Sequence, residues 1–184
     1  MFHPVSGSFT LIRPYFHAIE KNALGPSFIP ELFCMSASCI NILHIEDDPN
    51  DALLFRHACS TAGVGFELRA VCDGDEAIAY LRGAEQFADR KQHPVPHIIL
   101  LDLKMPRLSG FEVLSWLRSE NAFRKIPVII LTSSNHETDI KRAYDLGANS
   151  YVVKPVGFDA LVEVARKING YWVKFNHPAA TTSQ

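Results

Sequence analysis

Hydrophobic and polar positions follow a repeating order from about residue 41 onward. Short apolar runs predict strands at 42–45, 66–71, 97–101, 128–131 and 150–153. Between them, apolar residues recur at helical spacing after helix-starting residues such as Pro49, Asp73 and Ser109. The runs at 97–101 and 128–131 are apolar on both faces, as expected of strands in a parallel sheet that helices cover on both sides. The order predicts an α/β fold: a doubly wound, five-stranded parallel sheet with five helices, forming a three-layer sandwich.

The two ends of the chain lack this order. Residues 1–40 mix prolines, serines and aromatics without a period of 3.6 or 2, so we expect a poorly ordered N-terminal extension. Met35 lies shortly before the first predicted strand and is an alternative start of translation. The domain is expected to span 41–175, with an extended last helix, and residues 176–184 to form a flexible polar tail.

Composition narrows the class of protein. The 184 residues are 47% apolar and 21% charged, as in ordinary globular domains. A net charge of −2 without a dense Lys/Arg run argues against nucleic-acid binding, and no apolar stretch is long enough to predict a membrane span. The four cysteines lack the paired spacing of a zinc site, which favours free thiols in a reducing cytoplasm.

Reactive side chains follow the ends of four predicted strands. Glu46 and Asp47 follow the first, Asp102 the third, Thr132 the fourth and Lys154 the fifth. In open parallel sheets the binding crevice lies outside the carboxyl ends of the strands. We therefore expect these side chains to form one site.

The chemistry of this set points to phosphoryl transfer. Crowded carboxylates suit a hard divalent cation, and Mg²⁺ is commonly held by one or two carboxylates and a phosphate. A hydroxyl at Thr132 and an ammonium at Lys154 suit phosphoryl oxygens. There is neither a P-loop nor a triad-like nucleophile. What remains is a carboxylate that accepts a phosphoryl group.

Four fragments carry a resemblance to a known family. They are Ile-Glu-Asp-Asp-Pro at 45–49, Leu-Asp-Leu-Lys-Met-Pro at 101–106 with Ser109-Gly110, Ile-Leu-Thr-Ser at 130–133, and Gly147-Ala148 with Tyr-Val-Val-Lys-Pro at 151–155. In this order and spacing, they make residues 41–169 resemble a receiver domain of two-component response regulators, which implies a flavodoxin-like fold.

The resemblance also implies a role for each site residue. Asp102 would be the phosphorylated aspartate, with Asp47 and, through water, Glu46 holding Mg²⁺ together with the backbone carbonyl of Lys104. Thr132 would bond the phosphoryl group and Lys154 would pair with it. Tyr151 matches the aromatic switch position, and a cis peptide bond is expected at Pro155.

The implied function is that of a response regulator in a phosphorelay, which accepts a phosphoryl group from a sensor histidine kinase and switches a protein-interaction surface. No turnover of an external substrate is expected. With only a short tail after the last helix, the regulator is expected to stand alone. The longer connection at 86–96 and the aromatic C-terminal extension resemble regulators serving bacteriophytochrome-type and related hybrid histidine kinases.

Several alternatives remain at this level. Taken singly, Asp102 would be a turn or cap residue and Asp48 only a helix N-cap. His44 is expected to be a core or edge histidine with satisfied hydrogen bonds rather than a ligand. The chain could also be a non-phosphorylated pseudo-receiver scaffold, or a phosphate sink without a dedicated target. A haloacid-dehalogenase-type phosphatase would need Asp-x-Asp-x-Thr after the first strand, which is missing. At the end of the last helix, Trp172 and Phe175 either pack on the sheet or form a partner or homodimer surface.

Overall fold

The computed structural model describes residues 40–176. Nearly all of the predicted N-terminal extension, including Met35, and nearly all of the predicted C-terminal tail lie outside these residues. The strands are β1 (Ile40–Ile45), β2 (Phe66–Val71), β3 (Ile98–Leu101), β4 (Val128–Thr132) and β5 (Ser150–Val153). The α-helices are α1 (Pro49–Ala62), α2 (Gly74–Arg82), α3 (Gly110–Ser119), α4 (Glu137–Asp145) and α5 (Phe158–Ile168). A 3₁₀ turn at Glu85–Phe87 and a π-helix at Asn169–Phe175 were not predicted.

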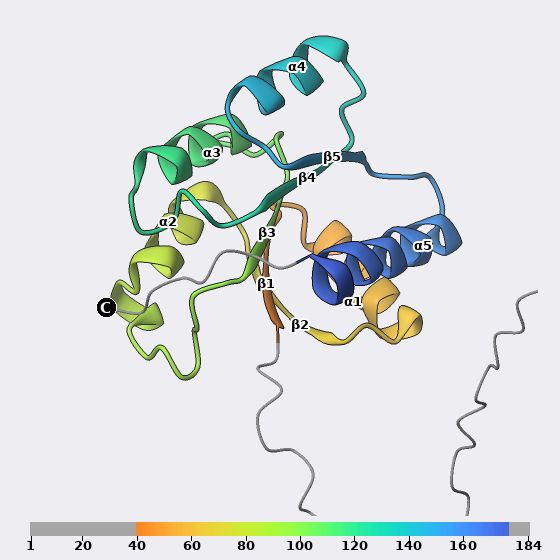
Figure 1. The fold of residues 1–184 in the computed structure, drawn as a ribbon, viewed down its shortest axis with the longest axis horizontal. Coiled ribbons are helices and arrows are strands. Elements are labelled where there is room, and N and C mark those ends of the chain that lie inside the picture. The colour runs from red at the N-terminus through yellow and green to blue at the C-terminus, as the bar shows by residue number, and fades with distance from the viewer. Residues whose placement is uncertain (1–39, 177–184) are drawn as a thin grey trace, which may run out of the picture. The chain divides into compact units, whose positions relative to one another are not determined.

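All five strands form one parallel sheet in the order β2-β1-β3-β4-β5. Helices α1 and α5 cover one face, and α2, α3 and α4 lie on the other (Figure 1). The predicted doubly wound, flavodoxin-like sandwich is therefore confirmed. Ile45 pairs with Leu101, so that Glu46 and Asp102 emerge side by side at the carboxyl edge.

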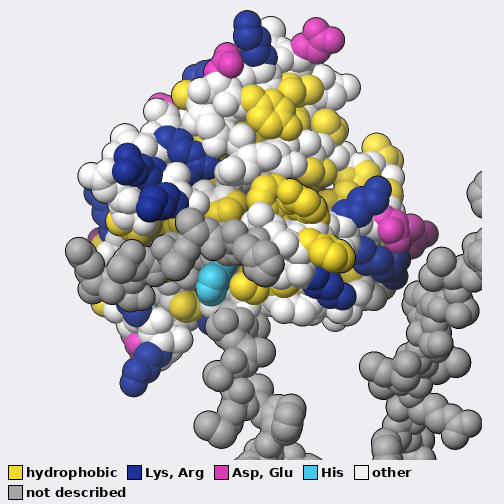
Figure 2. All heavy atoms as spheres, in the orientation of Figure 1, with side chains coloured by type: hydrophobic (Ala, Val, Ile, Leu, Met, Phe, Trp, Pro, Cys, Tyr) yellow, Lys and Arg dark blue, Asp and Glu magenta, His cyan; other side chains and the backbone are white. Residues whose placement is uncertain are grey.

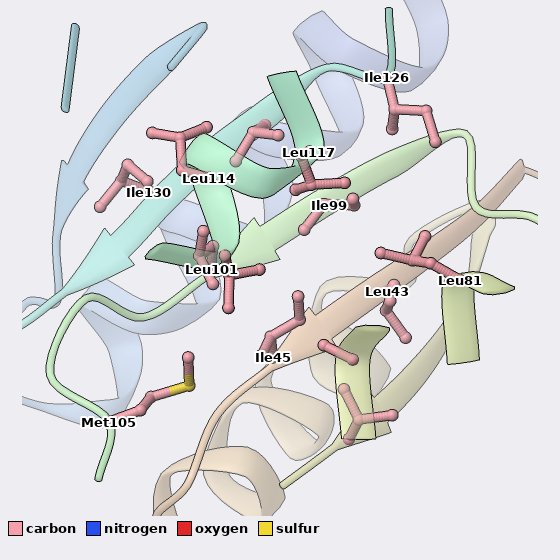
Figure 3. Close-up of a cluster of buried hydrophobic side chains, with 14 of the residues drawn as sticks. Leu43, Ile45, Leu81, Ile99, Leu101, Met105, Leu114, Leu117, Ile126 and Ile130 are labelled. Carbon is pink, nitrogen blue, oxygen red and sulfur yellow. The ribbon is translucent and has the colours of Figure 1, made fainter. Parts of the chain in front are cut away.

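The sheet divides the hydrophobic core into two layers, because successive strand residues point to opposite faces. On β3, Ile99 and Leu101 pack with α2 and α3, whereas Ile98 and Leu100 pack with α1 and α5. Figure 3 shows the first layer, where Leu43, Ile45, Ile99, Leu101 and Ile130 of the sheet meet Leu81 of α2 and Leu114 and Leu117 of α3. Burial of both faces explains why β3 and β4 are continuously apolar.

Arg118 of α3 forms hydrogen bonds with the loop that precedes the amino end of β4. The Arg118 guanidinium donates to the carbonyls of Gly147 (2.9 Å), Ile126 (3.1 Å) and Arg124 (3.2 Å), and to Asn149 Oδ1 (3.0 Å). It thereby ties α3 to the loops that precede β4 and β5. A planar fork with several donors suits such a junction.

The predicted extended last helix changes its winding at Asn169. The α-helix ends at Ile168, and a π-helix continues to Phe175. Asn169 is buried, and its Oδ1 accepts a hydrogen bond from Gly65 N at 3.1 Å. Trp172 packs against the α1/α5 core, while Phe175 is 76% exposed. Within residues 40–176, none of the helices has the length and hydrophobicity that a membrane crossing requires.

A carboxylate and lysine site at the carboxyl edge of the sheet

Asp102 lies at the centre of the edge where β1, β3 and β4 end. Asp102 is only 5% exposed to solvent. Its backbone N donates to the Ile45 carbonyl (3.0 Å), and its Oδ1 accepts a hydrogen bond from Lys104 N (3.2 Å). The start of α3 packs against the same backbone: a Cβ at Gly110 would overlap the Asp102 carbonyl oxygen and lie 2.8 Å from Leu103 Cα. The backbone of Asp102 is thus held between the end of β1 and the start of α3.

Lys154 follows β5 and points back to Asp102. Its Nζ lies 3.1 Å from Asp102 Oδ2, 2.7 Å from Glu46 Oε2 and 2.8 Å from Asp51 Oδ2. Burial alone would lower the pKa of this ammonium, but hydrogen bonds to Asp51 and Glu46 and the charge of Asp102 raise it above its ordinary value. Lys154 is therefore a permanent positive charge within the site.

The prediction of a cis peptide bond before Pro155 is wrong, because no peptide bond among the described residues is cis. The trans isomer is intrinsically favoured before proline. In this conformation the ammonium of Lys154 already reaches the three carboxylates.

A cluster of three carboxylates, which contains Asp47 and not Asp51, lies at the same edge of the sheet. Glu46, Asp47 and Asp102 each offer an oxygen, and these oxygens lie within 4.8 Å of one another. Burial raises the pKa of Asp47, and the neighbouring charges of Glu46 and Asp102 add to this rise. Repulsion of this kind is relieved by a cation, and an all-oxygen set suits Mg²⁺ or Mn²⁺. The donor set therefore fits the predicted metal, while the part played by the Lys104 carbonyl stays a prediction.

Thr132 approaches Asp102 from the end of β4 and is fully buried. Burial of Asp102 would raise its pKa, but the hydrogen bond from Thr132 and the charge of Lys154 outweigh burial and lower the pKa below its ordinary value. The carboxylate is accordingly ionised near neutral pH.

Tyr151 connects this edge to the loop after β4. Its hydroxyl donates to the Ser134 carbonyl at 3.0 Å, and Ser134 Oγ bonds Asp139 Oδ2 of α4 at 2.6 Å. Because Ser134 N also lies 3.5 Å from Thr132 Oγ1, the loop joins Thr132 to α4 and Tyr151. Ser134 is thus the residue that Thr132, Tyr151 and α4 all contact.

The fold brings five side chains together at one edge of the sheet, as the sequence predicted: Glu46, Asp47, Asp102, Thr132 and Lys154. The sequence patterns did not reveal Asp51, because an acid in the first turn of a helix is commonplace and only the fold brings it to Lys154. Asp48 caps α1 by accepting from Asn50 N at 2.8 Å, as its cap interpretation requires.

His44 is buried, as expected of a core histidine. Its ring nitrogens have no hydrogen-bond partner among the described residues, although Nε2 lies 3.6 Å from Glu46 Oε2. The description of this histidine as satisfied is therefore incorrect.

The sequence of this chain is similar to those of known proteins. Residues 42–166 match the family model of the response regulator receiver domain. The probable methanogenesis regulatory protein FilR2 of Methanothrix harundinacea is 36% identical over 135 residues, covering 73% of this chain and 84% of that protein. Response regulator Rcp1 of Synechocystis is 32% identical over 133 residues, covering 72% of this chain and 88% of that protein.

Solved structures of response regulators have a fold similar to that of this chain. The phosphorylated cyanobacterial phytochrome response regulator RcpA has a TM-score of 0.71 and 33% identity, over 78% of this chain and all of that one. The Mn²⁺-bound form of Rcp1 has a TM-score of 0.68 and 30% identity, over 77% of this chain and 99% of that one. The parallel sheet, the acidic cluster at its carboxyl edge and these similarities show that the chain belongs to the response regulator receiver family of two-component systems.

Proposed function

We propose that this receiver accepts a phosphoryl group on Asp102 from a sensor histidine kinase and thereby switches a protein-interaction surface. The observation that carries the proposal is the position of Asp102: an ionised carboxylate, with Lys154 Nζ 3.1 Å away and the oxygens of Glu46 and Asp47 beside it. A pseudo-receiver that had lost the chemistry would have no need of this set.

In the transfer, an Asp102 oxygen forms the new bond to phosphorus as the bond between phosphorus and the donor nitrogen or oxygen breaks. The donor atom leaves with the electron pair. Lys154 balances charge on the phosphoryl oxygens, and the Thr132 hydroxyl offers them a hydrogen bond. Glu46, Asp47, Asp102 and the Lys104 carbonyl would hold Mg²⁺, which supplies further neutralisation of the phosphoryl charge.

The test is incubation of the full chain with acetyl phosphate and Mg²⁺, followed by intact-mass spectrometry. Wild type should gain the mass of one phosphoryl group, and Asp102→Asn should gain none. If wild type stays unmodified with acetyl phosphate and with its own kinase, the pseudo-receiver interpretation is correct. Equal labelling of Asp102→Asn would place the acceptor elsewhere.

For the output we propose movement of Thr132 toward the phosphoryl group, followed by rearrangement of Tyr151. The support is the Thr132–Ser134–Tyr151 connection, in which the Ser134 carbonyl holds the tyrosine hydroxyl at 3.0 Å. A tyrosine fluorescence or NMR change at Tyr151 on phosphorylation, lost in Thr132→Ala, would support this. An unchanged Tyr151 signal would refute it.

The C-terminal segment is our candidate for a partner or homodimer surface. Tyr171 and Phe175 are exposed, Trp172 is partly buried, and Figure 2 shows hydrophobic side chains gathered between α4 and α5. Light scattering should show a dimer for the full chain and a monomer after truncation at Gly170 or in Phe175→Ser. Unchanged mass in all three proteins would reject the homodimer.

A phytochrome-like or hybrid kinase is the proposed phosphoryl donor, supported by similarity to RcpA, whereas FilR2 shows that similar chains occur in other regulatory settings. Phosphotransfer assays with the kinase domain would decide. We place the reaction in the cytoplasm, since Cys59 and Cys72 are free thiols.

A further inference from the structure

Asp51 contacts the site from a helix that supplies none of the clustered carboxylates. It lies in the first turn of α1, after the N-cap Asp48 and Pro49. Its side chain is 45% exposed, yet its Oδ2 lies 2.8 Å from Lys154 Nζ. This distance is shorter than the 3.1 Å between the same ammonium and Asp102 Oδ2.

The three carboxylates around Lys154 are not equivalent. Glu46 and Asp102 belong to the cluster whose oxygens lie within 4.8 Å of one another, and Asp51 does not. A divalent cation in that cluster would draw on Glu46 and Asp102 and would repel the ammonium. Of the three partners, Asp51 alone stays available to Lys154 in that state.

A hollow of about 230 Å³ adjoins Lys154, and much of its lining is apolar: Leu54, Phe55, Leu131, Pro155 and Leu161. An ammonium that lost its acceptors would be poorly solvated against such walls. Glu46 and Asp51 both line this hollow, and of the two only Asp51 lies outside the carboxylate cluster.

We propose that Asp51 is a positioning residue, which holds the Lys154 ammonium in place while a divalent cation occupies the carboxylate cluster. The inference rests on the proposed function, because it concerns how the metal and Lys154 share one site. By anchoring Lys154 to α1, Asp51 allows both positive charges to stand beside Asp102 together.

The test measures Mg²⁺ affinity of the full chain by isothermal titration calorimetry. Asp51→Asn should weaken Mg²⁺ binding about 5-fold, the size expected of one partly exposed ion pair. Asp51→Glu should restore most of the affinity. The matched control is Asp159→Asn, an exposed aspartate in the first turn of α5, which should bind as wild type does. Unchanged affinity in Asp51→Asn would overturn the proposal.

Loss of any nearby negative charge would also weaken a cation site, so a second comparison is needed. In a Lys154→Met background, Asp51→Asn should no longer change Mg²⁺ affinity. If the 5-fold loss persists there, Asp51 acts on the cation through space and the positioning role is wrong.

A direct readout avoids variants of Lys154. In NMR spectra of the Mg²⁺-bound protein, the Lys154 ammonium protons should be protected from exchange in wild type and exchange-broadened in Asp51→Asn. Equal protection in both would overturn the proposal. If wild type binds Mg²⁺ but is never phosphorylated, the proposed function fails, while the calorimetric and NMR comparisons still decide the role of Asp51.

Discussion

Replacement of Gly110 by alanine tests how closely α3 packs on Asp102. Gly110 is the first residue of α3, and its N donates to the Leu103 carbonyl at 3.1 Å. The added Cβ would overlap the Asp102 carbonyl oxygen and lie 2.8 Å from Leu103 Cα and 2.9 Å from Asp102 C. All three are backbone atoms, so no side-chain rotation can relieve the contact.

The expected cost follows from these contacts. Overpacking of a rigid site typically costs about 1–3 kcal/mol. Alanine regains about 0.5–1 kcal/mol over glycine within a helix. Because the overlap here is with backbone, we expect a cost near the upper end, about 3 kcal/mol, and a net loss of about 2–2.5 kcal/mol after the alanine gain. For a domain of this size that lowers the melting temperature by about 6–10 °C.

Urea unfolding of wild type, Gly110→Ala and Gly170→Ala gives the comparison. A Cβ at Gly170 meets nothing within 4 Å, so this matched control should be neutral or gain up to about 1 kcal/mol. If Gly110→Ala unfolds within about 0.5 kcal/mol of wild type, α3 packs on Asp102 more loosely than the structure indicates, and the argument fails.

Three further perturbations test the network around the sheet. Arg118→Met should lower the free energy of unfolding in urea by about 2–3 kcal/mol, because backbone carbonyls lose a charged donor. Arg118→Lys should recover only part of this free energy, and full recovery would refute the role of the planar guanidinium. Tyr151→Phe should cost about 0.5–1.5 kcal/mol through loss of the bond to the Ser134 carbonyl; no loss would show that water replaces it. Asp47→Asn should raise the melting temperature of the metal-free protein at pH 7 but abolish stabilisation by Mg²⁺. The pKa of Asp47 is raised in the folded state, so its contribution is favourable below about pH 4 and is lost as the pH rises through the raised pKa. The gain should therefore shrink on acidification, and a gain independent of pH would contradict this reasoning.

The fold was predictable because hydrophobic period and strand-end chemistry are local signals. Continuous apolar runs at β3 and β4 indicated burial on both faces, which only a parallel sheet between two helix layers supplies. Once the sheet is parallel, its strand ends share one edge. Glu46, Asp102 and Lys154 could then be assigned to one site without coordinates.

Other features depend on geometry that no local pattern carries. Asp51 reads as an ordinary first-turn acid until α1 is placed beside Lys154. The π-helix at Asn169–Phe175 follows from tertiary contacts, among them the bond from Gly65 N to Asn169. The isomer before Pro155 depends on a balance of about 1 kcal/mol that sequence does not reveal.

The two layers of helices contact Asp102 by different kinds of interaction. On the α1 side the contact is ionic, through Lys154 to Asp51. On the α4 side it is a series of hydrogen bonds through Thr132 and Ser134 to Asp139. Salt weakens partly exposed ion pairs much more than buried hydrogen bonds. A charge change at Asp102 would therefore reach the two faces with different sensitivity to ionic strength.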